Sequence, residues 1–133
     1  MVYDNFTKQT LFTDNNANVL CNRLYNALET EFTKVVLDTK FCITGTLAKI
    51  LNGALASDIK VIPFITNDDA IYDYCAKNLP KYLKATAVIF KDRIQLQYQS
   101  YYLEVWKTSS IGTIGSVSGF LVQDDADIPS NIL

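Results

Sequence analysis

One stretch near the middle of the chain has the residue types and the spacing that could bind a phosphate group. A predicted strand at residues 41–43 leads to Gly45 and Thr46 at the start of a predicted helix. Backbone N–H groups at the start of a helix have no partner inside the helix and can bind phosphate oxygens. A second predicted strand opens with Asp58 and places Lys60 on the same face, two residues later. The alternative is that Gly45 and Thr46 form an ordinary turn between a strand and a helix.

These residues resemble the motifs of the nucleotidyltransferase superfamily, in particular those of the abortive-infection type of toxin nucleotidyltransferases. That family carries a Gly-Gly or Gly-Ser/Thr pair at the head of a helix, then an Asp-x-Asp strand, and a third carboxylate on a later strand. Gly45-Thr46 matches the first motif and Asp58 matches the first acid. Glu104 lies in a predicted strand where the third carboxylate falls, so the resemblance covers about residues 40–107.

The resemblance implies a minimal nucleotidyltransferase-like fold and a set of site residues. Asp58 and Glu104 would be the catalytic residues and would hold Mg²⁺, while Gly45, Thr46 and Lys60 would contact a nucleoside triphosphate. The partner would be a nucleotide or another protein, and the setting would be a toxin–antitoxin or phage-defence system.

Lys60 departs from the family, because it stands where the second acid of the Asp-x-Asp motif is expected. The exchange removes a negative charge and adds a positive one where two divalent cations would bind beside the nucleotide phosphates. Like charges about 4 Å apart in a partly buried site repel each other by several kcal/mol. We therefore expect a pseudo-enzyme that binds a nucleotide or a protein. Lys60 itself could contact a phosphate, pair with Asp58 or face the solvent.

Two other functions stay open from the sequence. A working Mg²⁺-dependent nucleotidyltransferase would use Asp58, Glu104 and a further acid, such as Asp68 or Asp69, to hold the metal. A structural or oligomer-forming protein would instead use its tyrosine-rich strands, or its Gly- and Ser-rich C-terminal strands, as an interface.

The composition is that of an ordinary globular domain, and it excludes several classes of site. The net charge of −2 gives no basic surface, so nucleic acid is not a default partner. The chain has no histidine, which excludes histidine-based zinc sites and catalysis by Ser-His-Asp or Cys-His groups. Its three cysteines are widely spaced, which favours buried thiols in a reducing compartment over disulfides or a metal motif. Neither a signal peptide nor a membrane helix is visible, so we expect a cytoplasmic protein.

The order of predicted elements indicates an α/β or α+β fold, with a mixed sheet flanked by helices. Leucine and phenylalanine recur every four positions between Ala17 and Val36, which predicts one amphipathic helix of about five turns. A later helix is expected to run to about Asn78, where Pro80 closes it. β-Branched and aromatic runs predict strands at 58–65, 83–90, 94–98 and 101–106, with more β structure in 111–122.

The chain length predicts a single domain over residues 1–133. Within it, residues 1–13 are expected to form an N-terminal arm and residues 124–133 a solvated C-terminal tail. Pro63 lies inside the predicted strand 58–65, which indicates an edge strand or a bulge, because proline cannot donate a hydrogen bond to a neighbouring strand.

Overall fold

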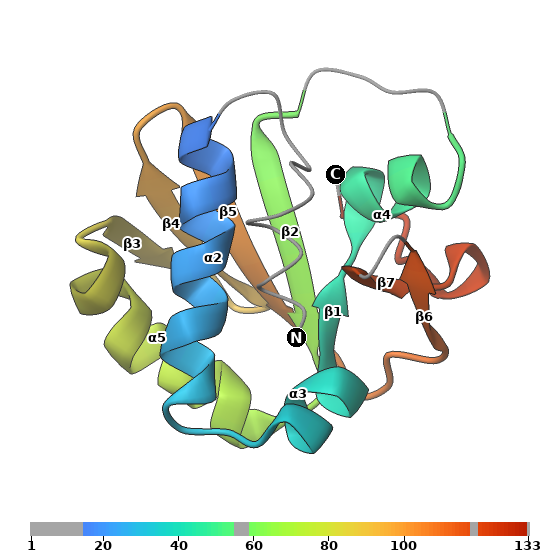
Figure 1. The fold of residues 1–133 in the computed structure, drawn as a ribbon, viewed down its shortest axis with the longest axis horizontal. Helices are drawn as coiled ribbons and strands as arrows, with labels where there is room; N and C mark the ends of the chain where they lie inside the picture. Colours follow the sequence, from blue (N-terminus) through green and yellow to red (C-terminus); the bar gives the residue numbers. More distant parts are fainter. Residues whose placement is uncertain (1–14, 55–58, 118–119, 133) are drawn as a thin grey trace.

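The chain folds around a seven-stranded mixed sheet, with its strands in the order β3-β4-β5-β2-β1-β7-β6. The structure, a computed structural model, describes residues 15–54, 59–117 and 120–132 (Figure 1). Helices α2 and α5 lie across one face of the sheet. The prediction of an α/β fold with a mixed sheet flanked by helices is confirmed. The arm predicted at residues 1–13 lies outside the described residues.

The helices and strands have the following bounds. The helices are α2 (Asn15–Glu29), α3 (Lys34–Lys40), α4 (Gly45–Leu51), α5 (Asp69–Leu83) and the short 3-10 helix η1 (Asp125–Asp127). The strands are β1 (Phe41–Ile43), β2 (Val61–Thr66), β3 (Thr86–Ile89), β4 (Arg93–Tyr98), β5 (Tyr101–Lys107), β6 (Ile114–Val117) and β7 (Phe120–Gln123). Among the described helices, none combines the length and the apolar character that crossing a membrane requires.

The single helix predicted from Ala17 to Val36 is wrong, because the structure has two helices there, α2 and α3. Hydrogen bonds of two threonine side chains mark the break between the two helices. The Thr30 hydroxyl donates to the carbonyl of Ala27 at 2.7 Å, and the Thr33 side chain caps α3 by accepting the N–H of Val36 at 3.3 Å. Such side-chain bonds compete with the regular helical ladder. The four-residue apolar spacing continues through the turn because Phe32 still packs against the core.

Helix α5 continues past Pro80 to Leu83, so the prediction that Pro80 closes the helix is also wrong. A proline inside a helix removes one backbone hydrogen bond. Leu79 and Leu83 are both fully buried on either side of it, so tertiary packing outweighs that loss. The helix ends at Lys84, which adopts the left-handed backbone conformation with φ 53°.

Asp68 caps the start of α5, and this cap gives a test at acid pH. Its carboxylate accepts the N–H of Ile71 at 3.0 Å and pairs with Lys40 at 3.3 Å, and these contacts hold the pKa of Asp68 below its ordinary value of 3.8. Because the pKa of Asp68 is lower in the folded chain than in the unfolded chain, its carboxylate stabilises the folded state at pH values above the ordinary pKa. This stabilisation is lost as the pH falls through the pKa of the folded state. We expect Asp68→Ala to lower the free energy of unfolding at pH 7 by about 1 kcal/mol, and Asp68→Asn to lower it by less. Urea titrations between about pH 5 and about pH 2 should show a weaker acid dependence for both variants than for the wild type. Equal acid dependence of Asp68→Asn and the wild type would contradict this role.

The register of the parallel strands β2 and β5 decides which side chains share a face of the sheet. Val61, Pro63 and Ile65 lie opposite Tyr102, Glu104 and Trp106, and these six residues define what we call the back face. The alternate residues, among them Phe64 and Leu103, belong to the main core under α2 and α5, which we call the helix face. A smaller apolar cluster covers part of the back face and consists of Cys42, Ile65, Trp106, Ile111 and Ile132.

Pro63 lies in an internal strand rather than at an edge. Tyr102 donates its N–H to the carbonyl of Lys60 at 2.9 Å, so the even-numbered residues of β2 bond to β5 and the odd-numbered ones point toward β1. Pro63 therefore presents its nitrogen to the β1 side, just beyond the end of β1, where its carbonyl still accepts the N–H of Thr44 at 3.0 Å. The N–H that proline lacks would lie beyond the last residue of β1, so its absence interrupts no hydrogen bond between β1 and β2.

The segment after β7, predicted as a solvated tail, packs partly against the body of the protein. Ile132 is 3% exposed and belongs to the back-face cluster. The buried amide of Gln123 donates to the carbonyls of Ile111 and Asp127 at 2.8 and 3.1 Å, and its oxygen accepts the hydroxyl of Thr44 at 2.5 Å. These bonds tie the C-terminal segment to the end of β1 and to the loop before β6.

All three cysteines are buried free thiols, as the spacing predicts. Cys21 and Cys75 lie in the helix-face core, whereas Cys42 belongs to the back-face cluster. Burial raises the pKa of the Cys42 thiol to about 12 and raises those of Cys21 and Cys75 as well. None of them is set up as a nucleophile or a metal ligand, because both roles require the thiolate.

Candidate functional site

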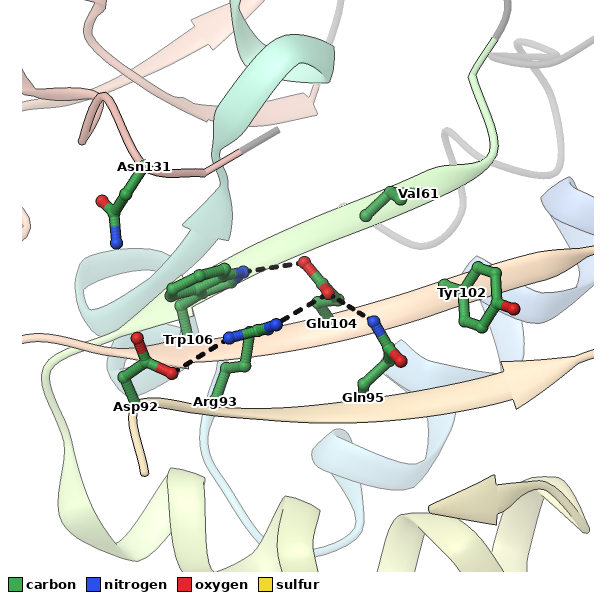
Figure 2. Close-up of a pocket in the computed structure, with 8 residues that line it drawn as sticks. All are labelled: Val61, Asp92, Arg93, Gln95, Tyr102, Glu104, Trp106 and Asn131. Atoms are coloured by element: carbon green, nitrogen blue, oxygen red, sulfur yellow. Dashed lines mark hydrogen bonds and ion pairs between the residues drawn. The ribbon is translucent and has the colours of Figure 1, made fainter. Parts of the chain in front are cut away.

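The hairpin of β4 and β5 gathers the polar side chains of the back face. A turn at Gln99 and Ser100 joins the two strands, and its two-residue length fixes their register. Gln95 therefore lies opposite Glu104, and Arg93 lies opposite Trp106. Because side chains alternate along a strand, all four project from the same face (Figure 2).

Glu104 is a buried carboxylate, 5% exposed, that accepts three hydrogen bonds from this group. Arg93 Nε and Gln95 Nε2 donate to one oxygen at 3.3 and 2.8 Å, and Trp106 Nε1 donates to the other at 3.0 Å. A buried charge is tolerated when it is paired and hydrogen-bonded. Glu104 is therefore held in one position by its neighbours on the sheet.

The guanidinium of Arg93 is also held in place by several neighbours besides Glu104. Its central carbon lies 4.1 Å from the ring centre of Phe90 and 4.7 Å from that of Trp106, which gives a cation–π contact with each ring. One terminal nitrogen donates to Asp92 at 3.1 Å. Arg93 thus joins two carboxylates, Asp92 and Glu104, while its side chain keeps 25% of its surface exposed.

A pocket of about 510 Å³ opens over this group. Its lining consists of Val61, Asp92, Arg93, Gln95, Tyr102, Glu104, Trp106 and Asn131 (Figure 2). A smaller hollow of about 190 Å³ continues from it past Trp106 and Asn131 toward Lys107 and Thr108. Aromatic ring faces beside a few fixed donors and acceptors are the usual lining of a small-molecule site.

The structure does not bring Lys60 to Glu104, contrary to the juxtaposition that the sequence predicts. Glu104 faces the back, whereas the ammonium of Lys60 lies 5.7 Å from the ring centre of Tyr101, whose side chain belongs to the helix-face core. Lys60 is exposed and does not line the pocket. The physical reason is the register: Tyr102 bonds to the carbonyl of Lys60, so Tyr102 and Glu104 share their face with Val61 instead.

The other predicted site residues lie away from the pocket or outside the described residues. Gly45 is buried and has φ 64°, and Thr46 is half-buried in the first turn of α4; neither lines the pocket. Asp58 lies outside the described residues. The roles predicted for Asp58, Gly45 and Thr46 stay predictions.

Asp68 and Asp69, the further acids of the alternative active site, follow Thr66 at the end of β2, and neither lines the pocket over Glu104. Asp68 caps α5, and Asp69 pairs with Lys107 at 2.8 Å.

The described residues do not fit a pair of magnesium ions at Glu104. Mg²⁺ prefers carboxylate and water oxygens in octahedral geometry. The Glu104 oxygens instead accept three N–H donors, and Asp92, the other carboxylate in the lining of the pocket, is bound to the same guanidinium. Within residues 15–54, 59–117 and 120–132, no three His, Cys, Asp or Glu side chains gather into a possible metal site.

Sequence reasoning found Glu104 but missed Arg93, Gln95 and Trp106 as its partners. The sequence of the β4–β5 hairpin already indicated these partners. A two-residue turn at Gln99 and Ser100 sets Gln95 opposite Glu104, and the alternation of polar residues along β4 puts Arg93 on the same face. No comparable pattern marks Asn131, because no residue near it in the sequence indicates that the C-terminal segment folds back over the sheet.

Comparison with known proteins gives one fold-level similarity. No protein-family model and no curated protein matches this sequence. A solved structure of a tRNA-processing enzyme in an apo form matches 87% of this chain with a TM-score of 0.53 and 13% identity. The chain spans 34% of that enzyme's length. At this identity the similarity shows a shared fold, one that an enzyme uses, and it does not assign an activity.

Proposed function

We propose that this domain is nucleotidyltransferase-like and binds a nucleotide in the back-face pocket without the paired metal ions of a working transferase. The observation that carries the proposal is the set of three donors, one of them an arginine, on the Glu104 carboxylate. Glu104 is the residue that the resemblance matches to a metal-binding acid. An arginine neutralises the charge that would attract Mg²⁺, so binding at this site would not depend on the metal.

The lining of the pocket favours a nucleotide over a partner protein. Tyr102, 36% exposed, offers an aromatic ring on which a base can stack. Gln95 and Asn131 have amide groups for the edge of a base, and Arg93 has a partly exposed guanidinium for an anionic group. A pocket of about 510 Å³ has the size of a small-molecule site.

Trp106 is the single tryptophan of the chain and lines the pocket, so its fluorescence can report binding. We expect titration with ATP, GTP, CTP or UTP to change the fluorescence of Trp106 saturably for at least one nucleotide. Because three donors already occupy the Glu104 carboxylate, the dissociation constant should change by less than about threefold when Mg²⁺ is replaced by EDTA. No saturable change with any nucleotide would contradict the proposal, and so would affinity that falls tenfold or more in EDTA.

A pair of tyrosine variants separates binding in the pocket from binding elsewhere. Tyr102 lines the pocket, whereas Tyr82 is similarly exposed but lies in α5 under the other face of the sheet. Stacking on an aromatic side chain contributes about 1–3 kcal/mol per base, so Tyr102→Ala should weaken binding by about tenfold. Tyr82→Ala should bind the nucleotide as the wild type does. An equal loss of affinity in both variants would show that the nucleotide does not bind in this pocket.

The proposal of an inactive enzyme has a test of its own. Incubation with nucleotides labelled at the α-phosphate and with RNA or protein acceptors should transfer no label. Transfer that is lost in Asp58→Ala would instead establish the alternative, an active nucleotidyltransferase with an atypical metal site. The toxin–antitoxin or phage-defence setting, like the cytoplasmic location, stays a prediction.

A further inference from the structure

The charges in the lining of the back-face pocket limit the kind of ligand that it attracts. Two carboxylates, Asp92 and Glu104, and one guanidinium, Arg93, line the pocket, which gives its lining a net formal charge of −1. The carboxylates bind different nitrogens of the guanidinium, at 3.1 and 3.3 Å (Figure 2). The cation that this pocket offers is therefore shared between two anions.

A phosphate that contacts Arg93 also meets the two carboxylates. Both of them lie within 3.3 Å of the guanidinium, so a group that binds its remaining N–H donors comes close to both negative charges. Coulomb energy falls only as the inverse of distance, so two anions slightly farther away offset the attraction of one nearer cation. Arg93 can donate a hydrogen bond to a phosphate, but the pocket as a whole does not attract one.

The neighbouring hollow does not supply a second cation. Lys107 belongs to its lining, but the Lys107 ammonium pairs with Asp69 at 2.8 Å and lies 5.5 Å from the ring centre of Tyr72. Both partners belong to α5, which covers the helix face, so this ammonium points away from the back face. Among the described residues, no further lysine or arginine lines either hollow.

The other polar groups in the lining of the pocket are uncharged. The amide nitrogen of Gln95 donates to Glu104 at 2.8 Å, which turns the amide oxygen away from the carboxylate (Figure 2). This oxygen can accept a hydrogen bond from the N–H of a base or the hydroxyl of a sugar. The amide of Asn131 and the phenol of Tyr102 provide further neutral donors and acceptors. These groups fit a base and its sugar better than they fit a phosphate chain.

We propose that the back-face pocket recognises an uncharged nucleoside, and that phosphates attached to it lie in the solvent and add no affinity. This inference rests on the proposed function for the place of binding, and it narrows the ligand from a nucleotide to its nucleoside part. Asp92 determines this specificity, because it supplies the second negative charge beside Arg93. Removing that charge should let the pocket attract a phosphate.

A series of ligands with one base and an increasing number of phosphates tests the inference. A nucleoside, its 5′-monophosphate and its 5′-triphosphate are titrated in EDTA at low ionic strength, where attraction between charges is least screened, and Trp106 fluorescence reports binding. We expect the nucleoside to bind no more than about threefold more weakly than the triphosphate. A triphosphate that binds about tenfold or more tightly than the nucleoside would overturn the inference and leave the proposed function intact. Binding of the nucleoside alone would support the inference and contradict the proposed function, and no saturable response to any of the three would contradict both.

Asp92→Asn tests the specificity-determining charge, because asparagine keeps the size of the side chain and removes its charge. We expect this variant to bind the triphosphate at least about fivefold more tightly than the wild type does, with the affinity for the nucleoside changed by less than about twofold. Asp73→Asn is the matched control, since it removes an equal charge from an exposed position of α5. It should bind both ligands as the wild type does. An unchanged affinity of Asp92→Asn for the triphosphate, or an equal gain for both ligands, would overturn the role of Asp92.

Discussion

Arg93→Met is expected to lower the free energy of unfolding by about 3 kcal/mol. Methionine keeps most of the apolar stem between Phe90 and Trp106 but removes the charge that neutralises Glu104. Glu104 is 5% exposed and would be left as a buried carboxylate with only the neutral donors Gln95 and Trp106. Urea unfolding followed by circular dichroism measures the loss.

A double-mutant cycle separates loss of the ion pair from loss of packing. Glu104→Gln alone should also destabilise the protein, because its amide group meets the donors of Arg93 and Trp106. In the double variant no buried charge is left unpaired, because Asp92, which also loses Arg93, is exposed. The double variant should therefore be more stable than the sum of the two single losses predicts, by about 1 kcal/mol or more. Additive losses would mean that Arg93 acts only by packing.

Phe64→Ala is expected to cost still more, about 4 kcal/mol of the free energy of unfolding. Phe64 is fully buried in the middle of β2, where its ring stacks on Phe41 at 5.1 Å and meets Tyr25 edge-on at 5.9 Å. Truncation leaves a cavity between the sheet and α2 and removes both ring contacts. Urea unfolding should show this loss with the folded secondary structure unchanged at zero denaturant.

Val35→Ala is the matched control for that truncation. Val35 is 73% exposed on α3, so shortening it should change the free energy of unfolding by less than about 0.5 kcal/mol. A loss below about 1.5 kcal/mol for Phe64→Ala would contradict the view that this ring cluster is the centre of the core.

Local periodicity and turn chemistry were enough to predict the fold class and most strands. The hairpin of β4 and β5 and the start of α5 follow from signals within a few residues, such as the turn at Gln99 and the cap at Asp68. The break between α2 and α3 does not follow from apolar periodicity, because it depends on side-chain hydrogen bonds of Thr30 and Thr33. The continuation of α5 through Pro80 does not follow either, because tertiary packing decides it. Leu79 and Leu83 hold α5 against the sheet beyond the proline, and no local pattern states the strength of that packing.

The candidate site was predicted only in part, and the reason is long-range register. Glu104 was found through its strand, but its face depends on how β5 aligns with β2, a parallel pairing between segments about forty residues apart in the sequence. A shift of one residue would move Glu104 to the same side as Lys60. No turn joins these two strands directly, so local sequence could not fix the choice.

The three buried thiols divide between the two sides of the sheet, and this division makes them natural reporters of partial opening. Cys21 and Cys75 lie beneath the helices, whereas Cys42 is covered on the other side by the cluster that includes Ile132. A reagent that reaches Cys42 first would signal lifting of the C-terminal segment, and one that reaches all three together would signal global unfolding. The native chain can therefore distinguish a local opening from a global one without an added label.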